Sequence, residues 1–261
     1  MSALNENIRR RLLSQIKLKA NEDESTTPTP VSETTETNNN SDQGRHPQDR
    51  PDYSNIDYWE DRYSSDNTSG TFEWVVTYSN PVLRSLLDTF ITSVHTSFLR
   101  PVKFLHPGCG DSTLGVDIMS SSTLSAPISL DNTDASPAVV SKMASLHPSS
   151  TWFVADVLSP CSTESRGSYD AVIDKCLCDA FLCGGVESDK LDKVKSYLRH
   201  CSEVTNDRGR LIMISFGQPE SRMRFFKQEG VGWSENVTVE EVVIPMEDGR
   251  KNKCWVYEFT K

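Results

Sequence analysis

Two glycines and one carboxylate are the residues whose types and spacing best suit chemistry on a ligand. Gly108 and Gly110 enclose Cys109 in a short turn, and Asp134 follows 24 residues after Gly110. Glycine lacks a Cβ, so the backbone of such a turn can approach a ligand closely. A carboxylate roughly 20 residues further on, at the tip of the next strand, is placed to accept hydrogen bonds from ribose hydroxyls. The spacing therefore predicts a site for a nucleotide-like cofactor, against the alternative of a structural turn with a surface aspartate.

The segments around these residues predict the elements that position them. Apolar residues at 102–105 and 128–130 indicate buried strands, and apolar residues recur at helical spacing over 114–119. Further along, we expect strands at 152–155, 171–173 and 210–215, helices at 136–146 and 190–204, a turn at 206–209, and two final strands at 237–244 and 255–259 that flank a hairpin turn at Glu247-Asp248-Gly249. The sequence therefore predicts an α/β fold: a Rossmann-like, seven-strand, mostly parallel sheet with one antiparallel strand near the C-terminus and helices on both faces.

Composition divides the 261 residues near position 52. Residues 20–52 are rich in Thr, Pro and Asn and have almost no apolar residues, so they cannot bury enough surface to offset the entropy of ordering them. Residues 1–19 carry five basic residues and one acidic residue among spaced apolar ones. We therefore expect a basic amphipathic arm at 1–19, a disordered linker at 20–52 and one folded domain at 53–261.

The N-terminal arm also bears on location. It has no continuous apolar segment of the kind found in secretory signals, and no later stretch is long enough to span a membrane. A start that is rich in Arg and poor in acid fits a mitochondrial presequence, a solvated helix or a partner-binding arm. We expect a cytoplasmic monomer, with a mitochondrial location left open by the arm.

Charge and cysteine usage limit the partners. The formal net charge is −10, and an acidic body repels phosphate backbones, so we expect no nucleic-acid substrate but a basic protein surface or a small molecule. The seven cysteines form no CxxC pair. Cys176, Cys178 and Cys183 lack the spacing and the nearby histidines of a zinc site. We therefore expect no bound metal, and reduced thiols in an intracellular protein.

Six short motifs follow one another at plausible spacings. They are Tyr58-Trp59-Glu60-Asp61-Arg62-Tyr63, Phe72-Glu73-Trp74, Pro107-Gly108-Cys109-Gly110-Asp111-Ser112, Asn132-Thr133-Asp134-Ala135-Ser136, Val172-Ile173-Asp174-Lys175 with Asp179 beyond it, and Gly232-Trp233-Ser234. Together they resemble the seven-strand S-adenosylmethionine-dependent methyltransferases of the elongation factor 1-alpha lysine methyltransferase type. The resemblance covers about residues 53–261 and is specific because all six motifs occur in order.

This resemblance implies that S-adenosyl-L-methionine is the cofactor and assigns residues to it. The residues implied to bind the cofactor are Trp59, Tyr63 and Trp74 around it, Gly108 at its amino-acid part, Asp134 at its ribose, Asp156 and Val157 at its adenine, and Lys175 beside its methionine end, together with Gly110 and Ala135. The aromatic residues have a structural alternative, because they could be ordinary core anchors of an N-terminal helix.

The chain departs from the family pattern at its turn and at its expected substrate mouth. Many methyltransferases have an acid where this chain has His106 and a third glycine where it has Ser112. A nicotinamide dehydrogenase is disfavoured because its fingerprint needs a glycine where this chain has Thr113. Residues 176–181, Cys-Leu-Cys-Asp-Ala-Phe, stand where the family usually has Gly-Thr-Leu-Asp-Ala-Leu. The segment should line the mouth where the acceptor enters, so the substrate stays open.

Methyl transfer itself asks little of the protein. A sulfonium methyl is already electrophilic, so the enzyme aligns an attacking lone pair behind it and excludes water. A lysine acceptor must lose a proton, and Asp174 and Asp179 are the candidate catalytic carboxylates that would orient the ammonium and favour its deprotonation. Each has a structural alternative: Asp179 could pair within the fold, and Asp174 could anchor a loop through backbone amides.

Three functions therefore remain open from the sequence. The first is methylation of a lysine on a protein such as elongation factor 1-alpha. The second is a methyltransferase of the same fold that acts on a small molecule, and the third is a non-catalytic Rossmann-like binding module.

Overall fold

The computed structural model describes residues 51–65, 70–121, 126–160, 166–245 and 251–261. The chain separates into two units, Met1–Pro51 and Asp52–Lys261, and every element below belongs to the second. The predicted arm at 1–19, nearly all of the predicted linker at 20–52 and the predicted hairpin turn at 247–249 lie outside the described residues. Those expectations remain predictions.

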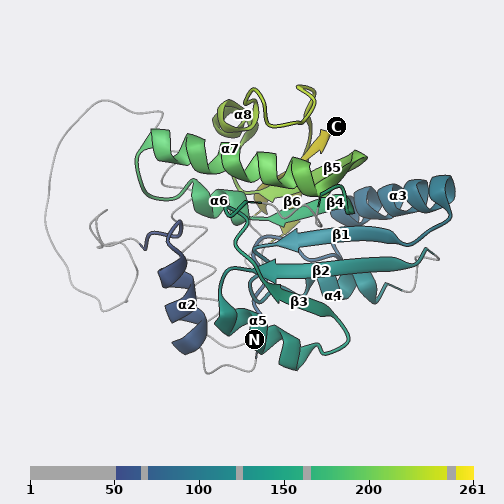
Figure 1. The fold of residues 1–261 in the computed structure, drawn as a ribbon, viewed down its shortest axis with the longest axis horizontal. Coiled ribbons are helices and arrows are strands. Elements are labelled where there is room, and N and C mark those ends of the chain that lie inside the picture. Colours follow the sequence, from purple (N-terminus) through teal and green to yellow (C-terminus); the bar gives the residue numbers. More distant parts are fainter. Residues whose placement is uncertain (1–50, 66–69, 122–125, 161–165, 246–250) are drawn as a thin grey trace, which may run out of the picture. The chain divides into compact units, whose positions relative to one another are not determined.

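A seven-stranded sheet forms the centre of the second unit (Figure 1). Its strands are β1 (Val102–Pro107), β2 (Ile128–Asp134), β3 (Thr151–Val154), β4 (Tyr169–Lys175), β5 (Thr205–Ser215), β6 (Thr238–Pro245) and β7 (Lys251–Thr260), and they lie in the order β3-β2-β1-β4-β5-β7-β6. The first five strands pair in parallel, whereas β7 is antiparallel to both β5 and β6. This arrangement confirms the predicted mostly parallel sheet with an antiparallel strand near the C-terminus.

Seven described helices accompany the sheet and cover its central strands. They are α2 (Ile56–Ser65), α3 (Pro81–Phe98), α4 (Leu114–Met119), α5 (Pro137–Leu146), α6 (Leu177–Phe181), α7 (Glu187–Val204) and α8 (Pro219–Phe226). In β4, six consecutive residues are buried, which requires cover on both faces of the sheet. No described helix is long and apolar enough to cross a membrane.

Helix α3 was not expected from the sequence, although its start carries a clear signal. The side chain of Asn80 accepts hydrogen bonds from the backbone N–H groups of Val82 and Leu83, and Pro81 occupies the first turn. The buried face follows the helical period: Leu83, Leu87, Phe90, Ile91 and Val94. The helix packs against β1, the strand that leads into the glycine turn.

The predicted turn at 206–209 is wrong, because these residues lie inside β5. Tyr169 on β4 pairs with Thr205, and Ala171 pairs with Arg210, so β5 holds extra residues between two pairs of its partner. The glycine and asparagine that indicated a turn instead occupy a bulge.

Candidate active site

The glycine turn and Asp134 meet at the carboxyl ends of β1 and β2. Gly108 and Gly110 have φ values of +56° and +52°, which glycine adopts with little strain. The Gly110 N–H donates to Oδ2 of Asp134 at 2.9 Å, and the Ser136 N–H donates to Oδ1 at 2.9 Å. Burial raises the pKa of Asp134, while these backbone donors lower it. The carboxylate therefore joins the turn to the start of α5 and keeps further acceptor capacity on both oxygens.

Both glycines of the turn are in close contact with side chains from distant segments. A Cβ on Gly110 would lie 2.6 Å from the hydroxyl oxygen of Tyr63, and a Cβ on Gly108 would lie 2.6 Å from Cδ1 of Leu177. A Cβ atom in a real protein essentially never lies this close to another heavy atom, so larger residues would displace their neighbours. The turn is thus held between α2 on one side and the start of α6 on the other.

The predicted aromatic residues form one cluster with Phe72. Trp59 and Tyr63 stack with ring centroids 6.0 Å apart, and Trp59 meets Trp74 edge to face at 6.0 Å. Phe72 packs edge to face on Trp74 at 4.7 Å, and its N–H donates to the carbonyl of Asp111 at 3.3 Å. Through Tyr63 and Phe72, the cluster contacts the glycine turn directly.

Lys175, at the end of β4, forms a buried ion pair with Glu73. The Lys175 side chain is 1% exposed, and its ammonium donates to Oε2 of Glu73. Glu73 also accepts hydrogen bonds from the hydroxyls of Ser112 and Thr113 at 3.0–3.1 Å. Glu73 therefore ties the segment after α2 to both β4 and the start of α4. Its role was missed because its partners lie far away in the sequence.

Asp174 sits beneath the first turn of α6. Its carboxylate is fully buried and accepts hydrogen bonds from the N–H groups of Leu177 at 2.8 Å and Cys178 at 3.1 Å. Burial raises the pKa of Asp174 to about 7, with a further rise from the nearby charge of Asp179. This is the backbone anchor that the sequence left as the alternative, and a direct part in the reaction stays a prediction.

Asp179 holds α6 to α8 and to the end of β5. Its Oδ1 accepts hydrogen bonds from Nη2 of Arg222 at 2.9 Å, Nε of Arg222 at 3.1 Å and the hydroxyl of Ser215 at 2.6 Å. Its Oδ2 accepts from the Phe216 N–H at 2.9 Å. These contacts match the structural alternative of a paired carboxylate, and a catalytic role for Asp179 is likewise untested.

Cys176 has an unusual backbone at the place where the family has glycine. Its φ is +69° and its ψ is 7°, in the left-handed region that L-residues with a Cβ adopt at a cost. The departure from the family pattern therefore leaves the glycine-like backbone in place and adds a thiol to it.

The remaining predicted residues lie at the same edge of the sheet. Ala135 directly follows Asp134, and the Ala155 N–H donates to the Asp134 carbonyl at 2.9 Å, which joins the ends of β2 and β3. Asp156 is exposed and accepts from the Leu158 N–H at 2.9 Å, whereas Val157 is buried in the core. All predicted residues thus lie at the carboxyl ends of β1–β4 or in segments that contact them, where such sheets bind ligands.

His106 is buried near the end of β1, beside this site. Its Nδ1 lies 3.1 Å from Oδ1 of Asn132, and burial together with the charge of Lys175 lowers its pKa to about 4. His106 stands where many members of the family that the motifs resemble have an acid, and its burial disfavours the charged imidazolium.

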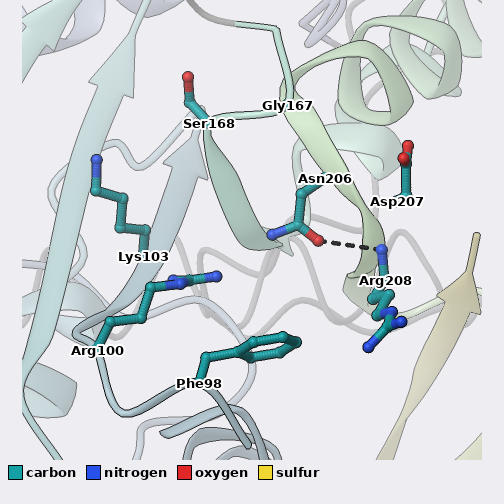
Figure 2. Close-up of a pocket in the computed structure, with 8 residues that line it drawn as sticks. All are labelled: Phe98, Arg100, Lys103, Gly167, Ser168, Asn206, Asp207 and Arg208. Atoms are coloured by element: carbon teal, nitrogen blue, oxygen red, sulfur yellow. Dashed lines mark hydrogen bonds between the residues drawn. The ribbon is translucent and has the colours of Figure 1, made fainter.

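A separate pocket opens at the opposite end of the sheet. Figure 2 shows the residues that line it: Phe98, Arg100, Lys103, Gly167, Ser168, Asn206, Asp207 and Arg208. Arg100 is bound there by the buried Asp170 through two hydrogen bonds of 2.6 Å. These residues precede or begin β1, β4 and β5, so the pocket lies away from the glycine turn.

Comparison with known proteins gives relatives that match most of the chain. The chain is 30% identical over 191 residues to EEF1A lysine methyltransferase 4 of Bos taurus, covering 70% of this chain and 69% of that protein. It is 29% identical over 190 residues to the mitochondrial citrate synthase-lysine N-methyltransferase CSKMT of Homo sapiens, covering 67% and 74%. Among solved structures, the N-methyltransferase NodS from Bradyrhizobium japonicum matches 78% of this chain and 97% of its own with 13% identity and a TM-score of 0.48.

No protein-family model matches the chain. The relationship is instead carried by the identity to EEF1A lysine methyltransferase 4 across more than two thirds of both chains. The seven-strand, mostly parallel sheet with antiparallel β7 agrees with the fold that the alternation of strands and helices in the sequence predicted. The chain belongs to the seven-strand, class I S-adenosylmethionine-dependent methyltransferases and is related to the lysine methyltransferases among them.

Proposed function

We propose that the protein transfers a methyl group from S-adenosyl-L-methionine to a lysine side chain of a protein substrate, with elongation factor 1-alpha as the first candidate. The observation that carries this proposal is the Gly110–Asp134 contact at the carboxyl ends of the strands. It occurs in a chain whose relatives are named as lysine methyltransferases of EEF1A and of citrate synthase.

The residues present fit the cofactor. Asp134 and Ala135 would hold its ribose, because both oxygens of Asp134 accept a backbone hydrogen bond and retain lone pairs for hydroxyls. Asp156 and Val157 would border its adenine at the end of β3. Gly108, Gly110 and Lys175 would lie beside its amino-acid end. Trp59, Tyr63 and Trp74 would close the site from α2 and the segment after it, and the close approach of the Tyr63 hydroxyl to Gly110 supports this placement.

The bound cofactor supplies an electrophilic methyl group. The chain itself then has to orient the acceptor amine and exclude water, and orientation can supply up to about 7–11 kcal/mol in favourable systems. Asp174 binds the first turn of α6 through backbone N–H groups, and Asp179 joins α6 to α8 through Arg222. Their first role is therefore to position α6, which would line the entrance for the acceptor. Both carboxylates are proposed to favour loss of the lysine proton, and burial raises the pKa of Asp174 to about 7, which suits a proton acceptor near neutral pH.

The acceptor is proposed from charge and from the relatives. The net charge of −10 favours a basic protein surface over nucleic acid. A small-molecule acceptor remains the second candidate, because Cys176 replaces the family glycine where the acceptor would enter. A non-catalytic binding module is the third. We propose a cytoplasmic monomer; the mitochondrial relative and the basic arm make mitochondria the alternative location.

The test is methyl transfer by the full chain from labelled cofactor to purified elongation factor 1-alpha, to purified citrate synthase and to a cell lysate. Intact-protein mass spectrometry should find one to three added methyl groups on a lysine of a protein. Asp134→Asn serves as the control, because it removes the charge that would hold the ribose and should abolish labelling. Label confined to small molecules would favour the second candidate, and cofactor binding without any transfer would favour the third.

A further inference from the structure

Arg62 lies at the centre of the aromatic cluster. Its Cζ is 5.4 Å from the ring centroids of both Trp59 and Tyr63, 5.7 Å from that of Phe72 and 5.2 Å from that of Trp74. Ring faces attract a guanidinium and help to fix its position. Its Nη1 is buried, yet it finds no hydrogen-bond partner among the described residues. A buried charged donor without a partner is costly, so the arrangement points to a partner that a ligand supplies.

Asp111, the residue after Gly110, presents the opposite charge in the same region. The residue is 2% exposed, and its Oδ2 is paired with Lys142 at 3.4 Å. Its Oδ1 is buried and has no hydrogen-bond partner in the part of the chain that the structure describes. Phe72 links the two residues, because its ring centroid is 5.7 Å from Cζ of Arg62 and its N–H donates to the carbonyl of Asp111 at 3.3 Å. Burial raises the pKa of Asp111, and the positive charge of Arg62 acts against that rise. One donor atom of Arg62 and one acceptor atom of Asp111 therefore lack a hydrogen-bond partner among the described residues, and Asp111 directly follows Gly110.

We propose that Arg62 and Asp111 bind the zwitterionic amino-acid end of the cofactor, with Arg62 donating to its carboxylate and Asp111 accepting from its α-ammonium. The inference rests on the cofactor placement in the proposed function. The two unpaired atoms match the two charged groups of an α-amino acid in sign and in hydrogen-bonding role. Lys175 is the other cation assigned to this end, but its ammonium is already paired with Glu73. Arg62 is therefore the residue that distinguishes the full cofactor from a bare adenosine.

Calorimetric titration of the full chain with two ligands tests the role of Arg62. S-adenosylhomocysteine carries the amino-acid end, whereas 5′-methylthioadenosine has the adenosine and the sulfur but lacks that end. Arg62→Met should weaken S-adenosylhomocysteine about 10- to 100-fold, as expected for a lost hydrogen bond to a charged group, and leave 5′-methylthioadenosine unchanged. Arg62→Lys keeps a cation between the rings, so its affinity for S-adenosylhomocysteine should fall less than that of Arg62→Met. Unchanged 5′-methylthioadenosine binding also shows that the variants fold.

Asp111→Asn tests the other half with an analogue of S-adenosylhomocysteine that lacks the amino group. This variant should bind S-adenosylhomocysteine more weakly than the wild type does, but it should bind the des-amino analogue as tightly. An equal loss for S-adenosylhomocysteine and 5′-methylthioadenosine in Arg62→Met would make Arg62 a structural residue and overturn the inference. The inference would also be overturned if Arg62→Met kept the wild-type preference for S-adenosylhomocysteine over 5′-methylthioadenosine. In that case the proposed function stands. A wild-type protein that binds none of these ligands would overturn both.

Discussion

The hydroxyl of Tyr63 lies against Gly110, so that a Cβ on this glycine would sit 2.6 Å from the Tyr63 oxygen. Tyr63 is on α2, before the first strand of the sheet, whereas Gly110 follows β1. Gly110 in turn donates to Asp134 at the end of β2. Helix α2, the turn and the carboxylate are therefore in direct contact with one another.

Gly110→Ala should destabilise the protein more than the same change at a matched glycine. Both Gly110 and Gly230 have positive φ, at +52° and +71°, so alanine costs about 1–2 kcal/mol at either from backbone strain. Nothing lies within 4 Å of a Cβ on Gly230, whereas Gly110 adds the overlap with Tyr63, worth about 1–3 kcal/mol more. Urea denaturation of the two variants measures the difference.

Tyr63→Phe provides the rescue for this comparison. Without the hydroxyl, the nearest Tyr63 atom to the new Cβ would be the ring carbon at 3.7 Å, an ordinary contact. Gly110→Ala should therefore cost less in the Tyr63→Phe background than in the wild type. Equal costs in both backgrounds would show that the hydroxyl does not limit the space at the turn.

Glu73→Gln should destabilise the protein strongly, because it leaves the Lys175 ammonium buried without its charged partner. Breaking one side of a buried pair costs about 3–5 kcal/mol. Lys175→Met in the same protein removes the orphaned charge, so the double variant should recover part of the loss. A double-mutant cycle by chemical denaturation measures this coupling, and additive effects of the two changes would contradict the pairing.

The sequence was informative where structure depends on neighbours along the chain. The strand–turn–helix around Gly108 and the carboxylate after β2 are local patterns, and both were found from spacing. The bulge in β5 was taken for a turn because Gly209 favours both, and only pairing with β4 distinguishes them. Glu73 and Arg222 were missed as site residues because each acts on a partner dozens of residues away, and no periodicity encodes such pairs.

Cys176→Gly tests the cost of departing from the family pattern. Cys176 and Leu99 both have positive φ, at 69° and 51°, and Leu99 is 83% exposed. Leu99→Gly should raise the free energy of unfolding by about 1 kcal/mol, because glycine relieves the strain and little packing is lost. Cys176→Gly should give a smaller gain, since the half-buried thiol is also removed. A thermal melt showing clear destabilisation of Cys176→Gly would mean that the thiol contributes more than the strain costs.

Asp174→Asn should change how stability depends on pH. Burial raises the pKa of Asp174 from 3.8 to about 7, so the folded state holds its proton more tightly than the unfolded state does. The stability that the protonated Asp174 contributes to the free energy of unfolding is therefore fully present below about pH 3.8 and is lost as the pH rises through about 7. Asparagine does not ionise, so the free energy of unfolding of the variant does not fall with pH through this position. Relative to wild type, the variant should gain about 2–3 kcal/mol in free energy of unfolding between pH 5 and pH 8.

The free energies of unfolding of wild type and Asp174→Asn also differ by an amount that does not vary with pH. This constant part reports the hydrogen bonds that Asp174 accepts from the N–H groups of Leu177 and Cys178. Only the part that varies with pH reports the charge. His106 gives a slope of the opposite sign, because its pKa is lowered to about 4, but it is present in both proteins and cancels in the comparison. Denaturant titrations at pH 5, 6, 7 and 8 measure the effect. A difference that stays constant across this range would mean that Asp174 is ionised throughout, and it would remove the basis for Asp174 as a proton acceptor near neutral pH.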